Sequence, residues 1–346
     1  MVKQGYKIAD AVAHVGDDML DAMDALMQTA PLRCRAWCVK CRCKCPTNPS
    51  PGETMGRLRG NAAGSICVEF SMRGSRRQLT GSTVCVWMNW IWERVALLED
   101  IIFHECTEQH PTERLMKRYL GRTHIVFVFV MCPSFRGEAC TRRRRMCLCL
   151  GRRFCMLSEP LWKSPHDVFS RERAIAAMEY FSAEDYEVQA FLRRRWAKLR
   201  KTTDLAAMDG VPSNRSLLSQ GARTRLEAYE RWIVDHGMCS RVVSDLTQNC
   251  AYAKGPRSAL GCILTRSVWW SHALERELLP CEGLELMGLP VLHSSIVRAG
   301  WECPWLSALH LLEDSSVRRV CGNGLHMPSV CALLLWAFGG VVELAS

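Results

Sequence analysis

The chain has 346 residues, of which 48% are hydrophobic and 23% charged, a composition that fits one large globular α/β domain or a core domain plus a smaller one. No uncharged apolar run reaches the roughly 18 residues of a membrane span, and the first residues lack the apolar core of a secretion signal. The formal net charge of +10 favours a polyanionic partner, because basic side chains that neutralise phosphates release counterions.

Five of the 20 cysteines cluster near the start of the chain, at Cys34, Cys38, Cys41, Cys43 and Cys45. Only Cys38 and Cys41 form a C-x2-C pair, and no second pair follows at zinc-finger distance. Without a secretion signal, reduced thiols explain the cysteines better than a disulfide framework. We therefore predict no metal site, with zinc-dependent binding through Cys34–Cys45 as the alternative.

The first predicted element is an amphipathic helix over 9–27, followed by a proline-rich loop over 34–60. A glycine-anchored turn then carries Cys67, and helical spacing of apolar residues predicts a helix over 84–98. The next segment, 100–105, predicts a buried strand that ends on Glu105. A nucleophile on one strand-to-helix loop and an acid at the end of the next strand are typical of sites in open α/β sheets.

Beyond Glu105 the sequence predicts a short helix over 107–119 and a strand over 125–130 that is buried on both faces. Four consecutive arginines precede a further predicted strand over 146–150. Because side chains alternate along an extended backbone, we expect Arg143 and Arg145 to share one face.

The second half of the chain opens with an irregular segment over 152–170 and continues with predicted helices over 182–199, 224–236, 280–288 and 328–338. The helix over 182–199 is rich in arginine and lysine. Two interpretations remain open for it, a contact with a phosphate backbone and an ordinary solvated face. Gly322, Asn323 and Gly324 are predicted to turn the chain into the last helix.

Five blocks of this sequence, in order, resemble motifs of the cytosine-C5 DNA methyltransferase family. Gly64 to Ser71 resembles the loop of the nucleophilic cysteine, Glu105 to Thr107 resembles the Glu-Asn-Val segment, and Thr141 to Leu150 resembles the arginine-containing strand. Arg276 to Pro290 is similar to the ninth motif of the family. Gly322 to Gly324 is similar to the tenth motif.

The resemblance implies an α/β fold, with a Rossmann-like class I methyltransferase sheet and a smaller, irregular target-recognition region. The domains expected from it are an atypical N-terminal segment (1–60), a methyltransferase core with the nucleophile loop (61–157), a target-recognition or insert region (158–260) and a C-terminal return to the core (261–346). The family also has a glycine-rich Phe-x-Gly-x-Gly strand and turn upstream, and no such segment occurs between Met1 and Gly60.

The resemblance further implies a cofactor and site residues. The cofactor is S-adenosylmethionine, and the substrate is duplex DNA with a flipped cytosine. The implied catalytic residues are Cys67, Glu105, Arg143 and Arg145; the implied cofactor-binding residues are Gly64, Gly322, Asn323 and Gly324; and the implied DNA-binding residues are Ser71, Arg73, Arg266 and Arg276.

The function expected from this resemblance is methyl transfer to C5 of cytosine through a cysteine thiolate adduct. The alternative is a catalytically degenerate homologue that binds nucleic acid or only folds. We expect a nuclear monomer with no membrane partner.

Overall fold

The structure is a computed structural model that describes residues 18–22, 24–25, 35–38, 43–46, 58–64, 69–71, 75–156, 163–172, 175–200, 213–250, 255–301, 306–309 and 311–343. The chain divides into two compact units. The first unit comprises Met1–Met131, Arg143–Trp162 and Gly339–Ser346, and the second comprises Cys132–Arg142 and Lys163–Phe338. Each unit is therefore assembled from separate stretches of sequence.

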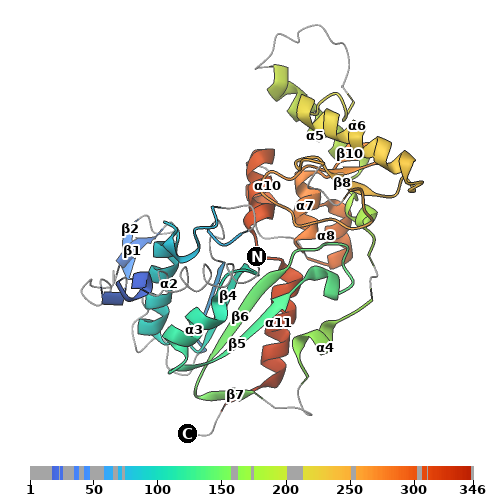
Figure 1. Ribbon diagram of the computed structural model, residues 1–346. Coiled ribbons are helices and arrows are strands. Elements are labelled where there is room, and N and C mark those ends of the chain that lie inside the picture. Colours follow the sequence, from blue (N-terminus) through green and yellow to red (C-terminus); the bar gives the residue numbers. More distant parts are fainter. Residues whose placement is uncertain are drawn as a thin grey trace, which may run out of the picture. The chain divides into compact units, whose positions relative to one another are not determined.

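A mixed four-stranded sheet forms the centre of the first unit, with strand order β3-β4-β6-β5 (Figure 1). Its strands are β3 (Gly60–Gly64), β4 (Ile101–Thr107), β5 (His124–Met131) and β6 (Arg144–Gly151). β3 and β4 are parallel and are joined through helix α2 (Val84–Leu97), whereas β6 is antiparallel to both of its neighbours. This β3-α2-β4 unit confirms the predicted Rossmann-like α/β class.

Helices α2 and α3 (Thr112–Leu120) pack with one face of this sheet in a single hydrophobic cluster. The cluster contains Met88 and Ile91 from α2 and Leu115 from α3, with Ile102 and Cys147 from the strands. The indole of Trp87 is also buried in it, as expected for a core tryptophan. Helix α3 begins later than the predicted residue 107, because β4 continues through Thr107.

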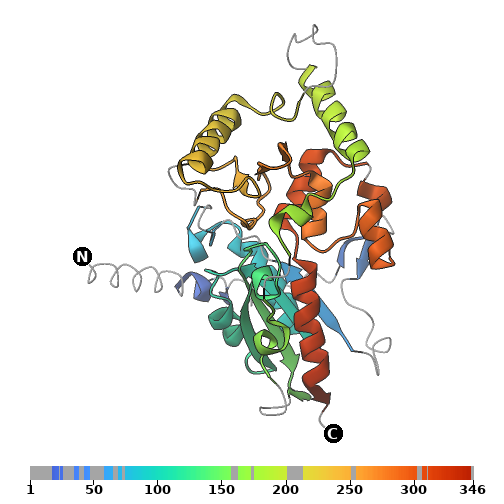
Figure 2. The same cartoon turned by 90° about the vertical axis from the view of Figure 1, so that its right-hand side faces the viewer.

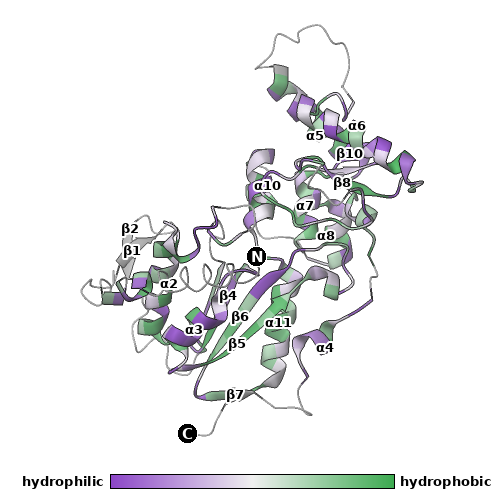
Figure 3. Ribbon diagram, viewed as in Figure 1, coloured by the Kyte–Doolittle hydropathy of each residue, from purple (hydrophilic) through white to green (hydrophobic). Residues whose placement is uncertain are grey.

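The order of strands corrects one prediction about burial. β5 lies at an edge of the sheet, and its residues 125–130 are only half-buried, although the strand is strongly hydrophobic (Figure 3). β6 lies between two strands, and its residues 146–150 are buried. The apolar run in β5 therefore marks an edge strand and not, as predicted, a strand covered on both faces.

Short strands occur where the sequence predicts loop. β1 (Arg35–Cys38) and β2 (Cys43–Pro46) form an antiparallel pair within the predicted loop over 34–60. β7 (Phe154–Met156) pairs with β11 (Val341–Glu343), and helix α4 (Pro165–Phe169) follows later in the segment predicted to be irregular. The thiols of the Cys34–Cys45 cluster lie outside the described side chains, so the zinc alternative stays a prediction.

The second unit combines a small antiparallel sheet with helices. Its strand order is β10-β9-β8, with β8 at Val243–Asp245, β9 at Trp269–Ser271 and β10 at Arg276–Glu277. Its helices beyond α4 are α5 (Asp185–Arg200), α6 (Gln220–Asp235), α7 (Pro280–Leu286), α8 (His293–Ala299), α9 (Leu306–Leu309), α10 (Asp314–Asn323) and α11 (Met327–Gly340). Helices α5 and α6 overlap in Figure 1 but are separate in the rotated view (Figure 2), and they belong to different hydrophobic clusters.

The predicted start and end of α7 are confirmed. Pro280 occupies the first turn, where its missing N–H costs no helical hydrogen bond. The chain leaves the helix through Gly288, which has a φ of +83°. A side chain at Gly288 would also meet Pro328, because a Cβ there would lie 2.3 Å from the proline ring.

By length and composition alone, one stretch of the described chain, Asp314–Gly340, could cross a membrane. The structure divides it into α10 and α11 at Gly324, and 44% of its most apolar window is buried. Neither α10, with 10 residues, nor α11, with 14, reaches the roughly 20 residues that a span requires. The stretch is weak evidence for a membrane protein.

Two histidines lie inside the α2/α3 cluster. The Trp87 indole donates to His104 Nε2 at 3.2 Å, and the rings of His104 and His110 are 5.4 Å apart. Burial, with the proximity of His110, holds the pKa of His104 well below its usual range. Burial and the nearby Arg145 charge lower the pKa of His110 to about 3. Both imidazoles are therefore neutral in the folded protein.

The neutral His110 should make stability fall in mild acid. The pKa of His110 is about 3 in the folded protein, below its ordinary value of 6.5. The contribution of this group to the free energy of unfolding is therefore complete above pH 6.5. It is lost as the pH falls toward 3, because the unfolded chain takes up the proton first. Between pH 7 and pH 5 we expect a loss of about 2 kcal/mol from this group. Urea unfolding of the wild type and His110→Gln at both pH values measures it, and equal acid losses in the two proteins would contradict the assignment.

Candidate active site

The strand ahead of the Cys67 loop lies directly beside the strand that carries Glu105. In the parallel β3–β4 pair, Gly64 is the register partner of Glu105, and Gly64 is the last residue of β3. The chain that leads to Cys67 thus leaves β3 next to Glu105, at the carboxyl end of neighbouring parallel strands. Cys67 itself lies outside the described residues, so the position of its thiol stays a prediction.

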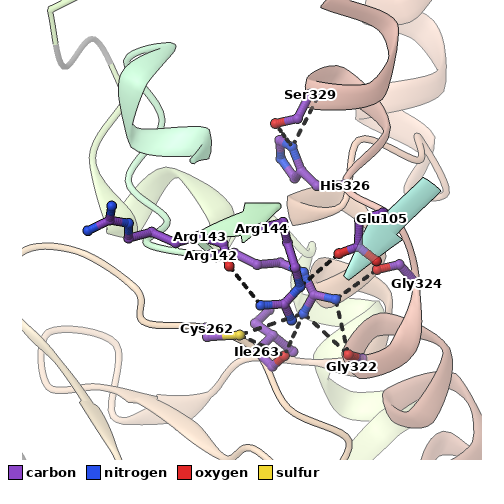
Figure 4. Close-up of polar contacts among 10 residues, drawn as sticks. All are labelled: Glu105, Arg142, Arg143, Arg144, Cys262, Ile263, Gly322, Gly324, His326 and Ser329. Carbon is purple, nitrogen blue, oxygen red and sulfur yellow. Dashed lines mark hydrogen bonds and ion pairs between the residues drawn. The ribbon is translucent and has the colours of Figure 1, made fainter. Parts of the chain in front are cut away.

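Glu105 forms a largely buried ion pair with Arg144. Arg144 Nε lies 2.8 Å from Glu105 Oε1, and the two side chains are 12% and 7% exposed (Figure 4). A buried carboxylate requires such a partner, because desolvation of an isolated charge is costly. The pair holds the carboxylate oriented at this end of β4.

The arginine that forms this ion pair is Arg144, which is not one of the two implied catalytic arginines, Arg143 and Arg145. β6 begins at Arg144, and Glu105 is the register partner of Met146. Side chains two apart in a strand share a face, so Arg144 lies on the Glu105 face and Arg145 on the opposite one. Arg143 precedes the strand, pairs with Glu108 at 2.9 Å and points away from Glu105 (Figure 4).

The opposite face gives Arg145 a different neighbour, His110, which the sequence interpretation had not singled out. The His110 ring contacts Phe70 edge-on, with ring centroids 4.6 Å apart. Phe70 follows Cys67 by three positions, so His110 anchors the chain just after the predicted nucleophile. No local motif marks this histidine, because its role depends on β6 and α2 packing around it.

Of the predicted cofactor residues, Gly322 and Asn323 are the last two residues of α10, and Gly324 begins the connection to α11. Asn323 is exposed at the end of α10, and Gly324 caps that helix. Gly322 packs on the backbone of Thr265, where a Cβ would come within 2.2 Å of the Thr265 nitrogen. The fourth predicted residue, Gly64, is exposed at the end of β3.

These residues fit S-adenosylmethionine in part. The exposed Asn323 amide offers both a donor and an acceptor to a polar ligand. Gly322 is required for packing of the chain itself, so its missing side chain is not evidence of a cofactor cradle. The segment before Gly60 supplies no glycine-rich turn by sequence.

The predicted DNA-binding residues differ in accessibility. Arg266 is exposed in a turn closed by the Ser267 N–H bond to Leu264 O, and Ser71 is half-buried. Arg276 is buried, and its guanidinium bonds both Glu282 oxygens at 2.9 and 2.7 Å. The prediction for Arg276 is corrected to a structural role, because burial leaves no guanidinium surface for a phosphate.

Arg73 lies outside the described residues, and its role stays a prediction.

The basic face of α5 is partly neutralised within the second unit. Arg194 pairs with Asp314 at 3.2 Å, and Lys198 pairs with Glu313 at 2.8 Å. Arg195 forms an ion pair with the buried Glu277. These contacts favour an internal structural role over the phosphate-backbone interpretation for this part of the helix.

No protein-family model and no curated protein sequence matches this chain. Among solved structures it is similar to the methyltransferase EhMeth of Entamoeba histolytica, with 10% identity, coverage of 81% of this chain and 77% of that one, and a TM-score of 0.47. It is also similar to the Dnmt2 methyltransferase of S. pombe, with 14% identity, 74% and 73% coverage and a TM-score of 0.38.

A mutant DNMT2 of Spodoptera frugiperda is a third similar structure, with 12% identity, 81% and 79% coverage and a TM-score of 0.38. Similarity at these values carries no argument about activity. The functional conclusion therefore rests on the chain's own motifs and geometry.

Adjacent arginines provide a matched test of the Glu105 ion pair. Arg144→Met should destabilise the protein by about 3 kcal/mol, because it removes the cation from a largely buried ion pair. Arg143→Met removes an exposed pair and should cost less than about 0.5 kcal/mol. Urea unfolding at pH 7 compares them, and equal midpoints would show that Arg144 does not hold Glu105.

Proposed function

We propose that this protein is an S-adenosylmethionine-dependent methyltransferase that acts on C5 of cytosine in DNA. The observation that carries the proposal is the parallel register of β3 and β4. In this register Gly64, three residues before Cys67, lies beside Glu105, which is paired with Arg144. The order of motifs along the chain agrees with this placement.

C5 of cytosine is a poor nucleophile. The enzyme must therefore supply a nucleophile of its own, which adds to the neighbouring C6 and activates C5. The Cys67 thiolate adds to C6, and Glu105, once it has taken up a proton, donates that proton to N3, so that electron density develops at C5. S-adenosylmethionine, when bound, supplies the methyl group that C5 takes up. Loss of the C5 proton to a base, expulsion of the thiolate and return of the N3 proton to Glu105 then restore the aromatic ring and the free enzyme.

Arg144 replaces Arg143 and Arg145 as the arginine of the proposed site. It keeps the Glu105 carboxyl group oriented through the 2.8 Å ion pair. Its guanidinium also places a positive charge at the strand end next to the Cys67 loop, which favours the thiolate form of a nearby cysteine. The target base must leave the duplex to reach these groups, at a cost of a few kcal/mol.

The alternative function is a degenerate homologue that binds nucleic acid without catalysis. The absence of a glycine-rich segment between Met1 and Gly60 favours it. A net charge of +10 and exposed arginines such as Arg266 suffice for phosphate contacts. In either function we propose DNA as the partner, a monomer as the active species and the nucleus as its location.

Covalent trapping distinguishes the two functions. DNA that contains 5-fluorocytosine should form a stable adduct with the wild type in the presence of S-adenosylmethionine, because fluorine at C5 blocks the final proton loss. Cys67→Ser should form none, and Glu105→Gln should form it at least about 100-fold more slowly, since it removes the proton donor. Denaturing gels measure the adduct. Cys85→Ser, which alters an exposed thiol, is the control.

Trapping that persists in Cys67→Ser would move the nucleophile to another residue. No trapping by the wild type, with no heat on titration of S-adenosylmethionine into folded protein, would favour the non-catalytic alternative.

A further inference from the structure

A short segment of the second unit, Glu138–Arg142, holds the α10–α11 connection at two points. Arg142 is 3% exposed and donates through Nη1 to Ile263 O at 3.0 Å and to Gly322 O at 3.2 Å. Through Nη2 it donates to Gly322 O at 3.2 Å and Gly324 O at 2.8 Å (Figure 4). One planar guanidinium therefore ties both glycines that flank Asn323 to a neighbouring loop.

The second point is His326, which caps α11. Its Nδ1 accepts the backbone N–H of Ser329 at 3.3 Å and lies 2.8 Å from the Ser329 hydroxyl. Because Nδ1 accepts, the ring proton is on Nε2, which donates to Glu138 Oε2 at 2.9 Å. Glu138 thus fixes both the tautomer and the orientation of the cap.

The segment that bears these two side chains is hydrogen-bonded through its backbone to Leu260. Leu260 N–H donates to Ala139 O at 2.7 Å, and Thr141 N–H donates to Leu260 O at 3.0 Å. Ala139 and Thr141, which form these bonds, lie between Glu138 and Arg142 in the sequence. The two side chains are therefore presented from a fixed strip of backbone.

Arg142 also differs in its partners from the buried Arg276 and the half-buried Arg318 of the same unit. Arg276 and Arg318 each bond a carboxylate, whereas the contacts of Arg142 among the described residues are three backbone carbonyls and the Cys262 sulfur. Burying a cation without an acidic partner costs free energy. We therefore infer that the contacts of Arg142 with the three carbonyls serve to position the backbone that bears them.

We propose that Arg142 and Glu138 are positioning residues for cofactor binding. They hold the Gly322–Gly324 connection so that the exposed Asn323 amide is presented, already ordered, to the polar end of S-adenosylmethionine. This inference rests on the proposed function, and neither Arg142 nor Glu138 touches the cofactor. A ligand that meets an ordered amide loses less entropy on binding than one that must order it.

The test compares the buried Arg142 with the half-buried Arg318 of the same unit by calorimetric titration with S-adenosylmethionine. Arg142→Lys keeps the charge but loses the planar fork, and should weaken binding about 10- to 100-fold, as outer-shell changes commonly do. Arg318→Lys removes contacts with Glu277 and Ser267 O, neither of which involves Gly322 or Gly324, and should leave the dissociation constant unchanged. Thermal unfolding shows whether the two variants are equally destabilised.

Glu138 supplies a second, independent pair of variants. Glu138→Gln keeps an oxygen acceptor for His326 Nε2–H and should retain affinity, whereas Glu138→Leu removes it and should weaken binding. If Arg142→Lys does not fold, this pair decides the inference by itself.

The outcomes separate the two proposals. Wild-type affinity in Arg142→Lys or in Glu138→Leu overturns the positioning role and leaves the methyltransferase proposal standing. Equal weakening in Arg318→Lys also overturns it, because the effect would then be general destabilisation. No binding by the wild type overturns the positioning role and the proposed function together.

Discussion

The antiparallel pairing of β6 with β4 is the constraint on which the candidate site depends. Because Glu105 is paired with Met146, Arg144 lies on the Glu105 face and Arg145 lies among the helices on the other face. A shift of one residue would exchange the two arginines. It would place Arg144 in the apolar cluster and Arg145 on the Glu105 face.

The same pairing explains why both faces of one sheet carry polar groups. On one face the Glu105–Arg144 pair is neutralised internally. On the other, His104 and His110 stay uncharged among tryptophan rings, with Arg145 close enough to oppose protonation of His110. Each buried polar group is thus matched to its surroundings, as a folded core requires.

In the second unit, much of the arginine content supports the fold. Arg276 bonds Glu282, Arg195 and Arg318 pair with Glu277, and Arg142 binds backbone carbonyls. The charge available to a polyanion is therefore smaller than the clusters in the sequence indicate. Exposed side chains such as Arg266 remain for that purpose.

The sequence by itself determined the α/β class, the helices α2, α5, α7 and α11 to within a few residues, and the strand that carries Glu105. These features follow from local periodicity, from Pro280 and from runs of β-branched residues, all of which act over short distances. The tertiary structure decided that β5 is an edge strand, that Arg144 meets Glu105, that Arg276 is buried and that Arg142 binds Gly322 and Gly324. Strand register depends on the packing of the whole unit. So do contacts such as the one between Arg142 and Ile263, which are 121 positions apart. No local sequence pattern encodes either.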